Sequence, residues 1–88
     1  MNVPCYKVIR LGHRWGVTER SISWVLAEFD DADYALDYAR ALATATDEAI
    51  LEREDERGRL EVRHVFSTDH AGLLRMSTVV VGPAAPSP

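Results

Sequence analysis

The stretch that decides the fold of this chain is Phe29-Asp-Asp-Ala-Asp-Tyr-Ala-Leu-Asp-Tyr-Ala-Arg-Ala-Leu-Ala43. Phe29 precedes aspartates that can accept hydrogen bonds from the free N–H groups of a first helical turn, and their charge suits the positive end of the helix dipole. The apolar residues then recur at three- and four-residue spacing, as on one helix face: Ala35, Tyr38, Ala39, Leu42 and Ala43. We therefore expect one helix over residues 29–43, with one face packed on the rest of the domain.

Strand-like sequence lies on both sides of this helix. The expected strands are residues 6–11, 15–20 and 21–28 before the helix, and residues 48–53 and 60–66 after it. An acidic turn closed by Gly58, which can take positive φ, joins the last two. In residues 60–66 bulky and polar side chains alternate, as in an antiparallel strand with one buried face.

This order predicts an α+β fold, namely an antiparallel sheet of four to five strands with one α-helix packed on one face. The element order is β-β-β-α-β-β, and an extra C-terminal strand over residues 73–81 remains an option. We expect residues 1–81 to form a single domain and the Pro-rich residues 82–88 to form a disordered tail.

Parts of this pattern resemble a small bacterial family of unknown function. The resemblance rests on Tyr6-x-Val8, on Trp15-x-Val17, on Phe29-Asp30 leading into the Ala-rich helix, and on the hairpin that contains Gly58. It covers roughly residues 6–66 and implies a strand meander, one helix and a C-terminal hairpin. The acidic helix start and the added residues 67–88 depart from the family pattern, and the family supplies no catalytic residue.

Length and cysteine content restrict the class of protein. A domain of 88 residues buries only about 60 to 65% of its unfolded surface, so a thin core and stabilisation by oligomerisation are expected. One cysteine cannot form an internal disulfide, which suits a reducing compartment. The N-terminus has no apolar signal core, and no segment reaches the roughly 20 apolar residues of a membrane span. We expect a soluble, cytoplasmic protein.

The formal net charge of −4 is unevenly distributed. Residues 1–20 carry a net +3, residues 28–56 carry −9, and the remainder carries +2. The basic first hairpin, with Arg10 and Arg14, leaves nucleic-acid binding open as an alternative function, and the aromatic set Tyr6, Trp15, Trp24 and Phe66 could serve as a stacking platform. The acidic total opposes this alternative, and we expect these aromatic residues to pack in the core.

The residues that could carry chemistry form no recognisable site. No Cys-x-x-Cys or His-Glu-x-x-His pattern is present, although Cys5 and His13 could approach each other across the first hairpin. His64 is expected to be a partly buried strand residue hydrogen-bonded to a neighbour, and His70 is expected to be exposed. We therefore predict no enzyme activity, no cofactor and no metal site.

The leading functional expectation is an interaction module that self-associates, most simply as a homodimer. One helix covers only part of a sheet, and residues 73–81 are too apolar for a free tail. The candidate interaction residues are Leu73, Leu74, Met76, Val79 and Val81.

A further alternative is an acidic, phage-type inhibitor of a nucleic-acid-binding machine. Its candidate acidic face is Asp31, Asp33 and Asp37, and it requires these carboxylates to be continuous with those of residues 52–56.

Overall fold

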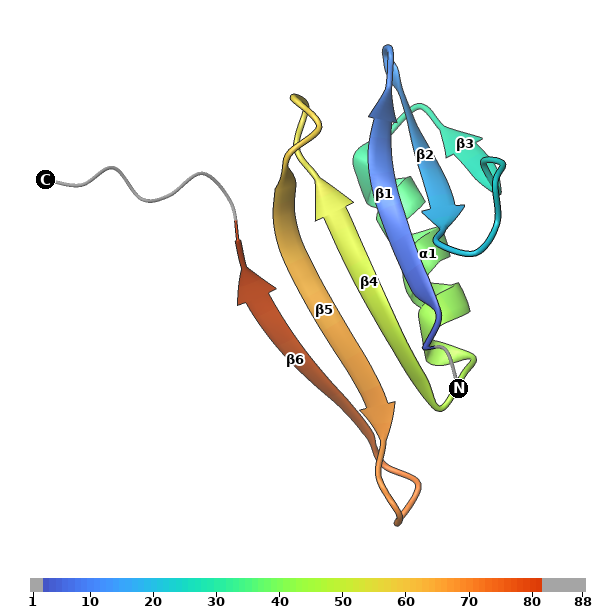
Figure 1. Ribbon diagram of the computed structural model, residues 1–88, viewed down its shortest axis with the longest axis vertical. Helices are drawn as coiled ribbons and strands as arrows, with labels where there is room; N and C mark the ends of the chain where they lie inside the picture. The colour runs from blue at the N-terminus through green and yellow to red at the C-terminus, as the bar shows by residue number, and fades with distance from the viewer. Residues whose placement is uncertain (1–2, 82–88) are drawn as a thin grey trace, which may run out of the picture.

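The computed structural model describes residues 3–81 and consists of six strands and one helix (Figure 1). The elements are β1 (Cys5–Leu11), β2 (Arg14–Glu19), β3 (Ala27–Phe29), α1 (Ala32–Thr44), β4 (Glu48–Glu54), β5 (Leu60–Thr68) and β6 (Leu74–Val80). The α+β class and the single helix are thus confirmed for the described residues. The expected tail, residues 82–88, lies outside them.

The strands form one mixed sheet in the order β3-β2-β1-β4-β5-β6. Strands β1 and β4 run parallel, with Tyr6 opposite Leu51, and the other neighbours are antiparallel. The prediction of a purely antiparallel sheet of four to five strands was therefore wrong. A parallel neighbour needs a crossover of about a dozen residues, which α1 supplies as the chain returns from β3 to the free side of β1.

The segment before the helix also differs from its predicted strand over residues 21–28. Only Ala27–Phe29 pairs with β2, because the chain turns after β2: the Ile22 amide donates to the Glu19 carbonyl at 3.0 Å, and the Ser21 hydroxyl donates to the Glu19 carboxylate at 2.7 Å. The resulting loop leaves Trp24 67% exposed, so its expected place in the core was wrong.

The core lies between α1 and one face of the sheet. Ala35, Ala39 and Ala43 of the helix are fully buried, and their small side chains let α1 approach the sheet closely. They pack against large side chains of the strands, which include Val8, Trp15, Val17, Leu51 and Phe66. The expected helix stripe is confirmed at its alanines, and Trp15 and Phe66 have their expected core positions.

Asp31 forms the N-cap of α1, since its carboxylate accepts a hydrogen bond from the Asp33 amide at 2.7 Å. Replacing Asp31 by alanine is expected to lower the free energy of unfolding by about 1 kcal/mol, because this amide loses its acceptor. Asp31→Asn, which keeps an accepting oxygen, is the matched control and should retain most of the stability in a urea titration. Equal losses for both variants would mean that charge, and not capping, is what Asp31 contributes.

The helix leaves part of the sheet uncovered. α1 packs chiefly on β1, β2, β3 and β4, and the β5–β6 hairpin projects to one side, with β6 at the outer edge (Figure 1). The opposite face of the sheet carries no helix within residues 3–81. Two surfaces are therefore candidates for function: the β6 edge and this open face.

Candidate interaction surface

Strand β6 pairs with β5 alone, and every one of its residues is exposed. Its apolar residues, together with the flanking residues Leu73 and Val81, are largely exposed. The exposed fractions are 59% for Leu73, 47% for Leu74, 55% for Met76, 53% for Val79, 75% for Val80 and 45% for Val81. These six residues are called the β6 strip below. The strip contains all five candidate interaction residues that the sequence indicates, and Val80, its most exposed member, extends the set.

The β6 strip has apolar side chains on both faces of the sheet. Met76 lies opposite Phe66 of the core, so Leu74, Met76, Thr78 and Val80 point to the side of α1. Leu73, Val79 and Val81 point to the open face. An edge strand with exposed apolar side chains on both faces offers its unpaired N–H and C=O groups, and apolar side chains beside them, to a further strand.

Asp69 holds the loop from which β6 begins. Its carboxylate accepts hydrogen bonds from the amides of Leu73 at 3.0 Å and Ala71 at 2.9 Å, and from Nε of Arg75 at 3.2 Å. Gly72 completes the turn with a φ of 82°, where other residues would be strained. Arg75 is the only charged residue of β6, and Asp69 neutralises it within the same chain.

The hydrogen bonds from Leu73 and Ala71, with Arg75, hold the pKa of Asp69 below its ordinary value of 3.8. Backbone hydrogen bonds from Arg59 and Arg57 lower the pKa of Asp55 in the β4–β5 turn in the same way. A lowered pKa in the folded state means stability that is complete above the unfolded pKa, about 3.9, and lost as the pH falls through the folded value.

The melting temperature is therefore expected to fall steeply below about pH 4. A shallower decline precedes it below about pH 6.5, because the lowered pKa of His64 makes this histidine harder to protonate in the folded state. Asp69→Asn should melt earlier at neutral pH and show a shallower fall in acid, because the group that titrates is gone. Calorimetry from pH 2 to pH 7 on both proteins checks this. The same acid slope in both would show that Asp69 is not among the groups responsible.

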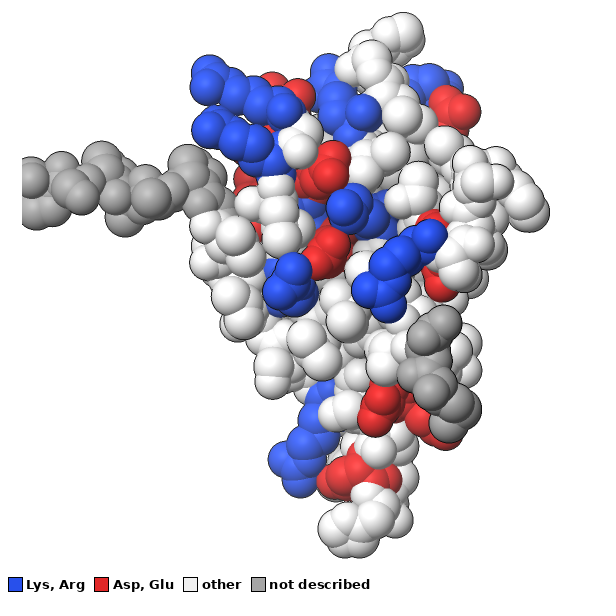
Figure 2. Space-filling model, in the orientation of Figure 1, with Lys and Arg blue, Asp and Glu red and all other residues white. Residues whose placement is uncertain are grey.

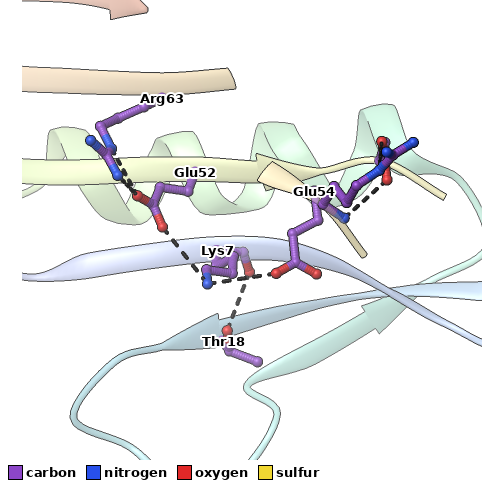
Figure 3. A network of polar contacts seen from close by, with 7 residues as sticks. Lys7, Thr18, Glu52, Glu54 and Arg63 are labelled. Carbon is purple, nitrogen blue, oxygen red and sulfur yellow. Dashed lines mark hydrogen bonds and ion pairs between the residues drawn. The ribbon is translucent and has the colours of Figure 1, made fainter. Parts of the chain in front are cut away.

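The open face is covered by charged side chains in contact with one another (Figure 3). Nε and Nη2 of Arg63 each lie 2.8 Å from Oε2 of Glu52. Nζ of Lys7 lies 3.8 Å from Oε1 of Glu52 and 3.6 Å from Oε2 of Glu54. Glu52, which contacts both Lys7 and Arg63, is only 9% exposed.

Figure 2, which views this open face, shows Lys and Arg side chains interspersed with Asp and Glu. A shallow hollow of about 540 Å³ lies over the network, and Cys5 lines its floor. Burial, followed by the nearby Glu52 carboxylate, raises the pKa of the Cys5 thiol, so the thiol is not poised as a nucleophile. Within residues 3–81, six of the ten large apolar residues that are exposed belong to the β6 strip, and the other four are Trp24, Tyr34, Tyr38 and Val65.

The cations of the first hairpin are also close to carboxylates. Arg14 lies 2.9 Å from Asp30 and 3.4 Å from Glu28. Arg10 lies 3.6 Å from Glu56 and stacks over Trp15. These contacts leave the basic hairpin with less free positive charge than its sequence indicates.

The structure separates the two groups of acidic residues. Asp31, Asp33 and Asp37 are exposed at α1, where Asp31 caps the helix and Asp37 lies 3.7 Å from Arg40. Glu52 and Glu54 point to the opposite, open face. The continuous acidic face that the inhibitor alternative requires is therefore not formed with Glu52 and Glu54.

The histidines lie apart from one another. Nδ1 of His64 is 2.8 Å from the Thr78 hydroxyl, as expected for a strand residue with a hydrogen-bonded neighbour, and His70 is exposed. Partial burial, then Arg40, lowers the pKa of His64. Cys5 lies at the start of β1 and His13 beyond its end, so the two do not meet.

Residues 3–81 contain no group of three or more His, Cys, Asp or Glu side chains arranged to hold a metal ion. They also contain no helix with the length and hydropathy needed to span a membrane.

Comparisons with known proteins give no relative: no family model matches the chain, and no curated protein or solved structure matches it significantly. The resemblance of residues 6–66 to a small bacterial family stays a prediction.

Proposed function

We propose that this protein is a non-enzymatic interaction module that self-associates through strand β6. The observation that carries the proposal is an edge strand of seven exposed residues with apolar side chains on both faces, in a domain whose open face carries a network of ion pairs. Self-association would place the module among small proteins that complete a sheet with a second copy. We place it in the cytoplasm because its single thiol is buried and free.

Within residues 3–81, the β6 edge lacks the features that keep edge strands apart. Soluble proteins protect such edges with lysine, proline, bulges or a covering segment, since the outward N–H and C=O groups otherwise pair with another chain. β6 pairs with β5 in unbroken register, contains no proline, and has Arg75 as its only charge. Because Arg75 is bound to Asp69, the edge is electrostatically neutral.

A second copy of the chain is the occupant that fits best. An antiparallel pair of identical strands has two-fold symmetry, so each copy offers its outward hydrogen-bonding groups and its apolar side chains to the same groups of the other. The joined strands would form one continuous sheet with an α1 helix near each end. Such pairing also adds buried apolar area to a domain whose core is thin for its 88 residues.

Sedimentation equilibrium of the full chain tests the proposal. We expect a mass of about twice 9.8 kDa at micromolar concentration, with dissociation on dilution. The same experiment in 1 M salt should leave the dimer intact, because the β6 strip is apolar and uncharged. A monomer at 100 µM would refute the proposal, and dissociation of a dimer by salt would move the interface to the charged surfaces.

A further inference from the structure

The backbone of β6 determines which of its residues can hydrogen-bond to a new strand. Val81 donates to the Glu61 carbonyl at 2.8 Å, and Asp69 donates to the Leu73 carbonyl at 2.9 Å. Antiparallel pairing alternates with a period of two, so Leu73, Arg75, Ser77, Val79 and Val81 direct their N–H and C=O groups toward β5. The groups of Leu74, Met76, Thr78 and Val80 point outward and are the ones that a second copy can reach.

The sequence of β6 is self-complementary about Ser77. Read outward from this residue, polar Thr78 corresponds to Met76, Val79 to Arg75, Val80 to Leu74, and Val81 to Leu73. Both ends of the strip are therefore apolar, with Ser77 midway between them, whereas the inner positions pair a polar residue with an apolar one. A strand with this pattern matches its own reversed copy, in which apolar ends pair with apolar ends.

Resting on the self-association proposed above, we infer that the two β6 strands pair antiparallel with Ser77 on the two-fold axis. Leu74 then lies opposite the partner's Val80, and Met76 lies opposite the partner's Thr78. These are all outward-pointing residues, so each of the pairs exchanges two backbone hydrogen bonds. Arg75 lies opposite the partner's Val79, and the two arginines stay about 13 Å apart along the strands.

The two neighbouring registers that keep the same hydrogen-bonding residues are less complementary. An axis at Met76 pairs Arg75 with Ser77 and leaves Val80 and Val81 beyond the paired segment. An axis at Thr78 leaves Leu73 and Leu74 beyond it and places Arg75 opposite Val81, so either shift exposes two apolar residues in each copy. The two shifted registers therefore bury less apolar surface than the register with its axis at Ser77, and the latter is favoured.

Disulfide trapping of the full chain tests this register. In a Cys5→Ala background, Ser77→Cys places two thiols in a non-hydrogen-bonded pair, whose Cα atoms lie about 4.5 Å apart, within the range that a disulfide spans. Arg75→Cys and Val79→Cys are matched controls, because they are exposed on the same face of the same strand. Oxidation in a glutathione buffer, followed by non-reducing electrophoresis, gives the rate of dimer formation.

We expect Ser77→Cys to cross-link to itself at least tenfold faster than either control does alone, and an equimolar mixture of the two controls to cross-link as heterodimers. A Ser77→Cys chain that couples to Arg75→Cys or Val79→Cys faster than to itself would overturn the register and identify an axis at Met76 or Thr78. If the unmodified chain still sediments as a dimer in that case, self-association stands and the register alone is wrong. A monomer by sedimentation, with equal slow cross-linking of all variants, would overturn both.

Discussion

Leu51→Ala is expected to lower the free energy of unfolding by about 2–5 kcal/mol. Leu51 is fully buried in β4, the strand that joins the helix-covered half of the sheet to the β5–β6 hairpin. Truncation removes apolar contacts and leaves a cavity that the paired strands β1 and β5 restrain from collapsing. For a domain of this size the loss corresponds to a fall of roughly 8–40 °C in melting temperature.

Leu51→Met is the matched control, since it keeps the volume nearly unchanged and should cost less than about 1.5 kcal/mol. Both variants and the parent chain are compared by thermal and urea unfolding at one fixed protein concentration, because self-association would make the apparent free energy of unfolding depend on protein concentration. A loss below 1 kcal/mol for Leu51→Ala would mean that β4 is not the centre of the core.

Local patterns in the sequence were enough to predict most of the elements. The alternation in residues 60–66 is reproduced by β5, and the alanines of the helix stripe are buried against the sheet. These patterns work because a side chain's periodic exposure is set by its own helix or strand. The sequence pattern did not predict that residues 21–26 form a loop instead of a strand, because this loop depends on the hydrogen bonds that Ser21 and Ile22 make to Glu19.

The sheet order could not be predicted in the same way. Whether β4 joins β1 in parallel depends on which sheet edge is free after β2 and β3 have paired, and no single strand carries that information. The candidate residues of the β6 strip were predictable because residues 73–81 are too apolar for a free, solvated tail. Their position at the edge, and the ion pairs that cover the open face, appear only when Lys7, Glu52 and Arg63 come together from three strands.

The largest effect on assembly is expected from Met76→Lys. Met76 is 55% exposed in the monomer and lies near the centre of the proposed strand pair. A lysine at this position should therefore change the stability of the monomer little, whereas the dimer contains the substitution twice and should lose free energy of association at both sites. Pairing in the plane of the sheet buries only part of the still exposed Met76 side chain, so each copy loses about 0.5–1 kcal/mol of the roughly 1.5–3 kcal/mol that full burial is worth. The two new charges add repulsion, because they lie about 7–8 Å apart as diagonal neighbours across the pair. The total loss is about 1.5–3 kcal/mol, which corresponds to a dissociation constant roughly 10- to 100-fold higher.

The control for this variant is Tyr34→Lys, which introduces the same charge at a site on α1 that is exposed to a similar degree, 67%. We expect Tyr34→Lys to sediment as the parent chain does, and Met76→Lys to sediment as a monomer with an unchanged circular dichroism spectrum. If both variants dissociate equally, added positive charge in general opposes association and β6 has no special part in it. If Met76→Lys stays as dimeric as the parent chain while it remains folded, the second copy binds elsewhere, because a lysine near the centre of a strand pair brings two like charges together where the parent chain has two methionines side by side.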